Sequence, residues 1–283
     1  MNFYEASGFE QQERDQADEF REAFNRSRNR RSISKSDYRA LKDHNPEDFH
    51  AANLFSRKLL SRAICDELEL KFCSDPHSLD HNQDVFFVTL LDIRCATDVS
   101  PTMPDLEQFK AIMRRGLRGL SYVGMMDVAY YANLAAPTRF NGKRCLFWHV
   151  HALVWGVTEH EMKKHIRRLN RSGQYLAIID GLKGALSKKV RQGTLPFVAG
   201  YMLKSPANAY RVWREDRSDN DGNLLINADG EVLAKFRQRK GHLRPGERVR
   251  LFKILRQVPL TDLAISGGKG KRILARAKRN AAL

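Results

Sequence analysis

The sequence has 283 residues, which suits one sizeable domain with additions or two small domains. Hydrophobic residues make up 42% of the chain and charged residues 29%, the composition of a soluble globular protein with a real core. The formal net charge is +16, from 49 Lys and Arg against 33 Asp and Glu, and this clustered excess favours a polyanionic partner, nucleic acid before an acidic membrane.

The cysteines and the start of the chain favour a cytoplasmic protein. The cysteines form no CxxC pair, so a zinc ribbon is disfavoured; they are Cys65, Cys73, Cys95 and Cys145. The first residues are acidic and polar, so we expect no signal peptide. No uncharged apolar run approaches the ~20 residues that span a bilayer, so we expect no membrane partner.

Residues 1–83 are expected to form a helical N-terminal region. It begins acidic, continues with a basic cluster between Arg26 and Arg39, and ends with apolar residues at helical spacing within residues 53–72. Residues 74–84, SDPHSLDHNQD, have the composition of a linker.

The centre of the chain alternates strands and helices. Apolar patterns and capping residues predict a strand at 84–93, a helix at 105–120, strands at 121–132 and 145–156, and a helix after the Thr158 and Glu161 capping box. A further strand is expected at either 174–180 or 185–190, followed by a helix at 194–204 that ends before Pro206.

This order predicts an α+β fold. It is the split βαβ, ferredoxin-like order, in which a central antiparallel sheet has its first and third strands in the middle. The helix at 194–204 would pack beside that sheet, completing a core at 84–215. A doubly wound parallel sheet is the weaker alternative, because the short loop before residue 145 favours a hairpin over a crossover. Residues 216–283 are expected to form a basic C-terminal region with a small hairpin and a helical stretch.

A histidine pair lies in the most apolar predicted strand. His149 and His151 are two residues apart, so on a strand they point to the same face and can bind one metal ion. Asp127 lies opposite them if the hairpin centre is near residue 138, and a carboxylate in an apolar strand needs a partner. The alternatives are two ordinary polar residues on a half-exposed strand, and an Asp127 that pairs with a basic side chain.

Tyr201 and Lys204 are three residues apart and would share one face of the helix at 194–204. A tyrosine hydroxyl is a weak nucleophile at its ordinary pKa of ~10. A nearby cation and a metal-polarised phosphate would make its attack feasible. The pair alone is too common to be informative, since a tyrosine at the edge of a core beside a solvated lysine has the same pattern.

Taken together, these residues resemble the HUH endonuclease superfamily, over about residues 84–206. VFFVTLLD looks like the first motif of replication initiators, FWHVHALVW like the metal-binding second motif, and AGYMLKSP like the third motif, which has a tyrosine followed by a lysine three residues later. Their order, spacing and secondary-structure context agree with those of a single-tyrosine rolling-circle replication initiator.

The resemblance implies that His149 and His151 hold Mg²⁺ or Mn²⁺, that Tyr201 attacks the scissile phosphate, and that Lys204 orients the site or balances its charge. The products would be a 5′-phosphotyrosine link and a free 3′-hydroxyl, which can be rejoined without ATP. The implied partners are single-stranded DNA at an origin hairpin of a plasmid or phage-like element, and a host helicase and polymerase.

Two positions depart from the pattern of the superfamily. Many initiators have Gln four residues after the second histidine, where this chain has Trp155, so the third ligand must come from elsewhere and Asp127 is the candidate. Initiators with two catalytic tyrosines space them on one helix face, but Ser205 follows Tyr201 at that spacing and Tyr210 lies beyond Pro206. We therefore expect a single catalytic tyrosine.

Other functions remain open. Relaxases normally place the tyrosine before the histidines, whereas single-tyrosine transposases share the present order but are little more than the core. A non-catalytic protein of the RNA-recognition type would have aromatic residues on its open sheet face and no need for a histidine pair.

Basic residues flank the predicted core and are expected to contact DNA phosphates. They lie in the helix after the histidine strand and in the C-terminal tail: Lys163, Lys164, Arg167, Arg168, Lys269, Lys271, Arg272 and Arg276. The simpler interpretation is a solvated helix face and a frayed tail.

Overall fold

The computed structural model describes residues 34, 49–72, 83–100, 102–136, 138–179, 181–191 and 193–281. Most of the N-terminal region expected at 1–83, most of the linker and Cys73 lie outside these residues. The described helices are α4 (Leu54–Phe72), α5 (Leu106–Gly116), α6 (Glu159–Arg171), α7 (Leu195–Met202), α8 (Pro245–Leu255), the 3₁₀ helix η2 (Leu260–Leu263) and α9 (Gly270–Asn280). The strands are β1 (Val85–Asp98), β2 (Ser121–Leu134), β3 (Lys143–Trp155), β4 (Ala185–Lys189), β5 (Asn208–Asp216), β6 (Ala234–His242) and β7 (Ala264–Gly267).

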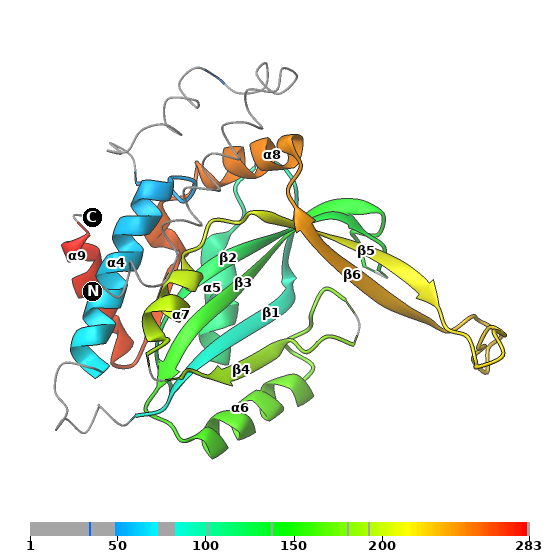
Figure 1. The fold of residues 1–283 in the computed structure, drawn as a ribbon, viewed down its shortest axis with the longest axis horizontal. Coiled ribbons are helices and arrows are strands. Elements are labelled where there is room, and N and C mark those ends of the chain that lie inside the picture. The colour runs from blue at the N-terminus through cyan, green and yellow to red at the C-terminus, as the bar shows by residue number, and fades with distance from the viewer. Residues whose placement is uncertain are drawn as a thin grey trace.

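All seven strands belong to one curled sheet, and the fold is α+β (Figure 1). Its strand order is β4-β1-β3-β2-β5-β6, with β7 also paired to β2. Neighbours are antiparallel from β4 to β2, but β5 runs parallel to β2. The sheet is therefore mixed: its run from β4 to β2 is antiparallel, as expected for the centre of the sheet, but the parallel pairing of β5 with β2 was not expected.

The two faces of the sheet have different neighbours. α5 lies behind the sheet in Figure 1, where the Tyr175 hydroxyl donates to the carbonyl of Ile112 at 2.9 Å. α6 belongs to this same side, since the His165 ring lies 2.7 Å from the carbonyl oxygen of Gly116 at the end of α5. α7 and α4 cover part of the opposite face, where Phe72 packs edge-on against Trp155. The rest of that opposite face remains open and carries the site described below.

Apolar patterning placed the central elements well. β3 is buried from Cys145 to Trp155, as its nearly uninterrupted apolar sequence predicts. The capping box of Thr158 and Glu161 is present at the start of α6. Of the two candidates for the next strand, 185–190 contains β4, whereas the described residues 174–179 contain only an isolated β-bridge from Leu176 to Lys183. α5 ends at Gly116 rather than at residue 120, and Gly119 then turns the chain with a positive φ of 83°.

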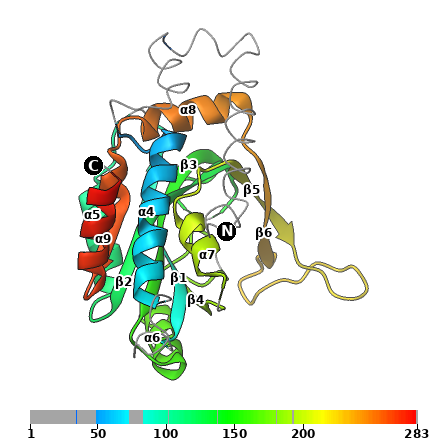
Figure 2. The same cartoon turned by 60° about the vertical axis from the view of Figure 1, so that its left-hand side comes forward.

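The last residues of the chain pack on the predicted core. β7 pairs with β2, and α9 buries Ile273, Leu274 and Ala277 beside α4 and β2 (Figure 2). The start of α9 comes so close to β2 that a Cβ at Gly270 would lie 1.8 Å from the carbonyl oxygen of Tyr122. The α9 segment is therefore folded against the sheet, and the frayed-tail interpretation does not hold for residues 270–280.

β5 and β6 form a long hairpin that projects from the body of the molecule (Figure 1). The sequence predicted a hairpin here but a smaller one, because only the turn residues near its tip were recognised. Its root continues the sheet beyond β2 and therefore lies next to the open face.

Candidate metal centre

Three potential metal ligands meet on the open face of the sheet. The register of β2 and β3 pairs Asp127 with His149, as expected from the centre of the hairpin, and His151 lies two residues further along the same face. One ligand atom from each residue lies within 4.8 Å of the others. All three side chains are buried. Within the described residues, this cluster could hold a metal ion.

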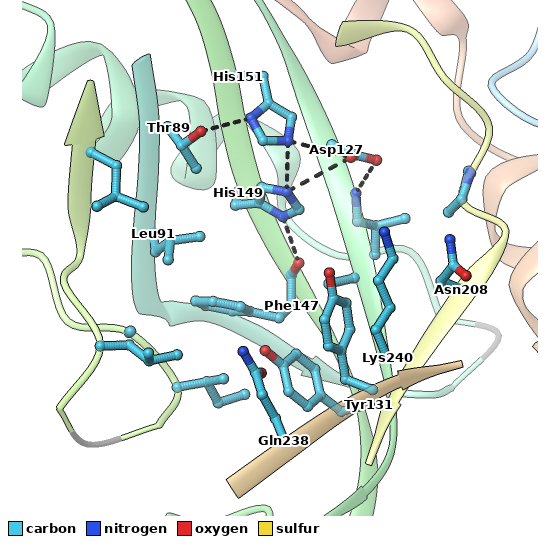
Figure 3. Close-up of a pocket in the computed structure, with 18 of the residues that line it drawn as sticks. Thr89, Leu91, Asp127, Tyr131, Phe147, His149, His151, Asn208, Gln238 and Lys240 are labelled. Carbon is cyan, nitrogen blue, oxygen red and sulfur yellow. Dashed lines mark hydrogen bonds and ion pairs between the residues drawn. The ribbon is translucent and has the colours of Figure 1, made fainter. Parts of the chain in front are cut away.

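The hydrogen bonds of the histidines aim their other nitrogens at a common point (Figure 3). His149 Nδ1 lies 3.2 Å from the carbonyl oxygen of Phe147, and His151 Nδ1 lies 2.9 Å from Thr89 Oγ1. A carbonyl can only accept, so His149 carries its proton on Nδ1, and the Thr89 hydroxyl can accept one from His151 in the same way. The two Nε2 atoms lie 3.2 Å apart, and when both rings carry their proton on Nδ1 these atoms present lone pairs to each other. Two lone pairs that close repel each other, so the arrangement fits a shared cation.

The electrostatics of the cluster keep the imidazoles neutral. Burial lowers the pKa of His149, partly offset by Asp127, and burial together with His149 and Lys204 lowers the pKa of His151 well below its ordinary value. Burial opposes ionisation of Asp127, but the Lys204 cation holds the pKa of this carboxyl below its usual range. Two neutral imidazoles beside a carboxylate are the protonation states in which these groups bind metal.

Asp127 also pairs with Lys204. The alternative interpretation of the sequence, in which Asp127 pairs with a basic side chain, is therefore correct as well. Its Oδ2 accepts from Lys204 Nζ at 2.5 Å and lies 3.7 Å from His149 Nε2 and 3.6 Å from His151 Nε2. Oδ1 accepts from the backbone N–H of Val128. Burial opposes the charge of Lys204, but Asp127 raises the pKa of this lysine above its ordinary value, so Lys204 stays a cation. One carboxylate oxygen thus faces both the lysine and the two imidazole nitrogens.

Tyr201 places its ring beside this cluster from α7. The ring centroid is 5.4 Å from that of His151 and 5.8 Å from that of Phe87, and Lys204 Nζ lies 4.0 Å from the Tyr201 centroid. Tyr201 is 37% exposed, unlike the buried ligands. A phenol that is open to solvent, next to a cation and a candidate metal, can reach a substrate that enters from outside.

The cluster and Tyr201 open into one pocket of about 510 Å³. Its floor is the open sheet face, with Thr89, His151, His149, Asp127 and Tyr131. One side is formed by Ala177, Ile178, Gly181, Leu182 and Lys183 together with Leu186 of β4, and the other by Asn208, Tyr210, Gln238 and Lys240 of the β5–β6 hairpin (Figure 3). The pocket joins segments that lie more than a hundred residues apart in the sequence.

Arg57, which sequence reasoning missed, anchors the helix that carries Tyr201. Its buried guanidinium donates from Nη1 to the carbonyl oxygens of Leu203 and Lys204, both at 3.0 Å, and from Nε to Ala51 at 2.5 Å. The carbonyls at the end of a helix have no partners within the helix, and a cation there also offsets its dipole. A lone arginine among the apolar positions of α4 was the available signal.

The predicted DNA-contacting residues lie away from this pocket. Lys163, Lys164, Arg167 and Arg168 belong to α6, on the side of the sheet shared with α5. Lys269 comes just before α9, and Lys271, Arg272 and Arg276 lie on it, beside α4. The pocket instead contains Lys183, Lys204 and Lys240. Of these three cations, sequence reasoning singled out only Lys204.

The structure shows what surrounds Trp155 and Tyr210, the two positions at which the sequence departs from the motifs of the superfamily. Trp155 is buried against Phe72, which takes it out of reach of the metal cluster, and Asp127 on the neighbouring strand occupies the third position. Tyr210 lies on β5 rather than on α7, and its ring stacks on Tyr131, with centroids 5.2 Å apart. Tyr201 is therefore the tyrosine that α7 brings to the cluster.

Among the described residues, no helix combines the length and the apolar character needed to cross a membrane. Comparison with protein-family models, with curated proteins and with solved structures returned no match.

Proposed function

We propose that this protein is a metal-dependent nuclease that nicks and rejoins single-stranded DNA through Tyr201, as a single-tyrosine initiator of rolling-circle replication does. The observation that carries the proposal is that Tyr201, Lys204 and the cluster of Asp127, His149 and His151 open into one pocket. The resemblance to HUH endonucleases supports it, as does the run β4-β1-β3-β2, which we interpret as a ferredoxin-like core extended by β5, β6 and β7.

The residues of the cluster suit a divalent ion with an open coordination position. Imidazole and carboxylate ligands together fit Mn²⁺ or Mg²⁺ in a catalytic site, with a phosphate oxygen as a further ligand. When bound, the ion would polarise the phosphate and offset its negative charge. His149 and His151 would hold it through Nε2, and Asp127 through Oδ2.

Tyr201 is the proposed nucleophile. Its hydroxyl oxygen forms a bond to the phosphorus while the bond from the phosphorus to the 3′ oxygen breaks. The phenol proton passes to water, and the 3′ oxygen takes a proton and leaves as a hydroxyl. The phosphotyrosine ester retains the energy of the broken phosphodiester, so attack by a 3′-hydroxyl can reverse the reaction without ATP.

Lys204 is proposed to stabilise the charge that develops on Tyr201. Its ammonium group lies 4.0 Å from the centre of the tyrosine ring, close enough for its positive charge to offset negative charge that develops on the oxygen atoms during the attack. It does not serve as the base, because Asp127 raises its pKa and keeps it protonated. The same ammonium is close enough to the pocket to pair with a substrate phosphate.

Cleavage of a labelled single-stranded oligonucleotide tests the proposal. We expect cleavage that requires Mn²⁺ or Mg²⁺, stops in excess chelator, and is lost in His149→Ala and His151→Ala. His160→Ala, which removes an exposed histidine of α6 outside the pocket, serves as a matched control and should cleave normally. Undiminished cleavage in chelator would rule out the metal-dependent mechanism.

Tight binding without cleavage under any metal condition would favour the non-catalytic alternative. Phe87, a half-buried residue of the open face whose ring lies beside Tyr201, would then be part of the binding surface, whereas Phe147 and Tyr131 are buried.

A further inference from the structure

The root of the β5–β6 hairpin presents one row of side chains to the pocket. The register pairs Tyr210 with Lys240 and Val212 with Gln238, so these residues share a face. Tyr210, Gln238 and Lys240 line the pocket, and Figure 3 shows Gln238 and Lys240 beside the floor residue Tyr131. We call these three residues the hairpin row.

The opposite face of the same strands points away from the pocket. Arg239 and Arg211 are paired in the register and neither lines the pocket. Arg211 instead donates to Glu247 of α8 at 3.3 Å. Arg239 and Lys240 are adjacent residues of β6, but their positively charged side chains lie on opposite sides of the hairpin. Of the two, only Lys240 faces the pocket that contains the metal centre.

The hairpin row combines the groups that recognise a nucleotide. Lys240 is exposed, and no acid among the described residues pairs with it, so its charge remains available for a phosphate. Gln238 is also exposed, and its amide offers a donor and an acceptor to a base edge. Tyr210 stacks on Tyr131 at an interplanar angle of 24°, which forms a flat aromatic surface of the kind that bases contact.

The position of the row fits the strand that the pocket is proposed to bind. Lys204, whose Nζ atom lies 4.0 Å from the centre of the Tyr201 ring, and Asn208, the first residue of β5, line the same pocket as the hairpin row, so a chain held at Tyr201 can continue toward the hairpin. Lys183 lies on the opposite wall of the pocket, beside Leu186 of β4. A single strand passing over the metal centre would therefore have a cation on each side.

We propose that the hairpin row is a binding subsite for a nucleotide of single-stranded DNA that flanks the phosphate held at the metal centre. Lys240 neutralises a phosphate of this nucleotide, Gln238 hydrogen-bonds the edge of its base, and Tyr210 supports the base. This subsite rests on the proposed function, because it would give a sequence preference to the same pocket in which single-stranded DNA is proposed to be cleaved.

Salt-dependent binding of a fluorescent single-stranded oligonucleotide tests the phosphate contact, with Lys240→Gln compared with Arg239→Gln. Both variants remove one exposed positive charge from adjacent residues of one strand, but only Lys240 faces the pocket. We expect Lys240→Gln to weaken binding several-fold and to reduce the slope of log affinity against log salt by about 0.7, the effect of one phosphate contact on a single strand. Arg239→Gln should leave the slope unchanged. Equal decreases in both variants, or no decrease in either, would overturn the subsite, provided that thermal melts show both variants folded.

Base preference tests the second contact. Homopolymers of dA, dC, dG and dT of equal length are titrated against the unaltered protein and Gln238→Ala. We expect the unaltered protein to prefer one base and Gln238→Ala to reduce that preference several-fold, since an apolar side chain cannot read a base edge. An unchanged preference profile would contradict the role of Gln238.

These binding measurements need no cleavage, so a failed subsite and a failed nuclease give different results. If the subsite is wrong, cleavage stays intact and the two charge variants bind alike. If the nuclease is wrong, the binding differences persist without cleavage.

Discussion

At the scale of single residues, Asp127 has two competing partners. Its Oδ2 atom pairs with Lys204 at 2.5 Å and also faces the Nε2 atoms of both histidines. A divalent ion bound there would lie close to the ammonium group, and a double and a single positive charge about 4 Å apart repel by about 8 kcal/mol at an effective dielectric constant near 20. Lys204 should therefore weaken metal binding while it supports the chemistry at Tyr201.

Replacing Lys204 by Met should separate these two effects. We expect Lys204→Met to bind Mn²⁺ about tenfold more tightly, or about 1.4 kcal/mol, because Asp127 is released and a repelling charge is removed. DNA cleavage should fall in the same variant. Calorimetric titration of DNA-free protein measures the affinity, and Lys183→Met, which alters a lysine on the opposite wall of the pocket, is the control. Weaker manganese binding in Lys204→Met would show that the lysine supports the metal site instead.

At the scale of elements, the position of Tyr201 depends on a helix from the N-terminal half of the chain. Arg57 of α4 joins α7 to α4 through the carbonyl oxygens of Leu203 and Lys204. The metal ligands, by contrast, lie on β2 and β3 and are held by the pairing of those two strands. The nucleophile and the metal ligands are thus held by different parts of the fold.

Arg57→Met should therefore reduce cleavage more than it reduces metal binding. Removing the hydrogen bonds of a buried charged donor is expected to cost about 2–4 kcal/mol of stability and to loosen the end of α7. The affinity for Mn²⁺ should be the same as that of the unaltered protein. Urea unfolding and manganese titration provide the two readouts, with Arg62→Met, an exposed residue of α4, as the control. A parallel decrease in metal binding and cleavage would mean that α4 supports the whole sheet face.

Elements with strong local patterns could be predicted, and those defined by distant pairing could not. The apolar strand around His149 and the hairpin that places Asp127 opposite it follow from alternation and loop length alone. The parallel pairing of β5 with β2 joins two segments that are distant in the sequence, which no local pattern records. Arg57 and Lys240 were missed for the same reason, because each acquires its role only from residues that the fold brings beside it.

At the scale of the whole molecule, the excess of positive charge divides into separate regions. The net charge is +16, but of the described lysines and arginines only Lys183, Lys204 and Lys240 line the pocket. The basic residues of α6 and α9 lie on other surfaces, and those of α9 are anchored by the buried residues of that helix. Removing the C-terminal segment would therefore remove buried apolar packing along with charge, so point variants are the appropriate test of its role.

Lys271→Gln combined with Arg272→Gln tests whether α9 contacts DNA. Both side chains are exposed, so the fold should persist. If they bind phosphates, the salt slope should fall by about 0.7 for each phosphate that is no longer neutralised. Cleavage of a short oligonucleotide at saturation should stay unchanged, because the pocket is untouched. Arg118→Gln, also exposed and outside the predicted DNA-binding residues, is the control. An unchanged slope of log affinity against log salt would mean that these charged side chains of α9 are solvated and do not contact DNA.

The most direct test of the proposed mechanism is to identify the residue that becomes covalently joined to DNA. The protein is incubated with Mn²⁺ and a single-stranded oligonucleotide that it cleaves, digested with a protease, and the peptide attached to the 5′-phosphate is sequenced by mass spectrometry. We expect the phosphate to be attached to Tyr201. We also expect that Tyr201→Phe forms no adduct but still binds the oligonucleotide, because only the hydroxyl is removed. An adduct on Tyr210 or Tyr175, or a covalent product that persists in Tyr201→Phe, would contradict the proposed mechanism.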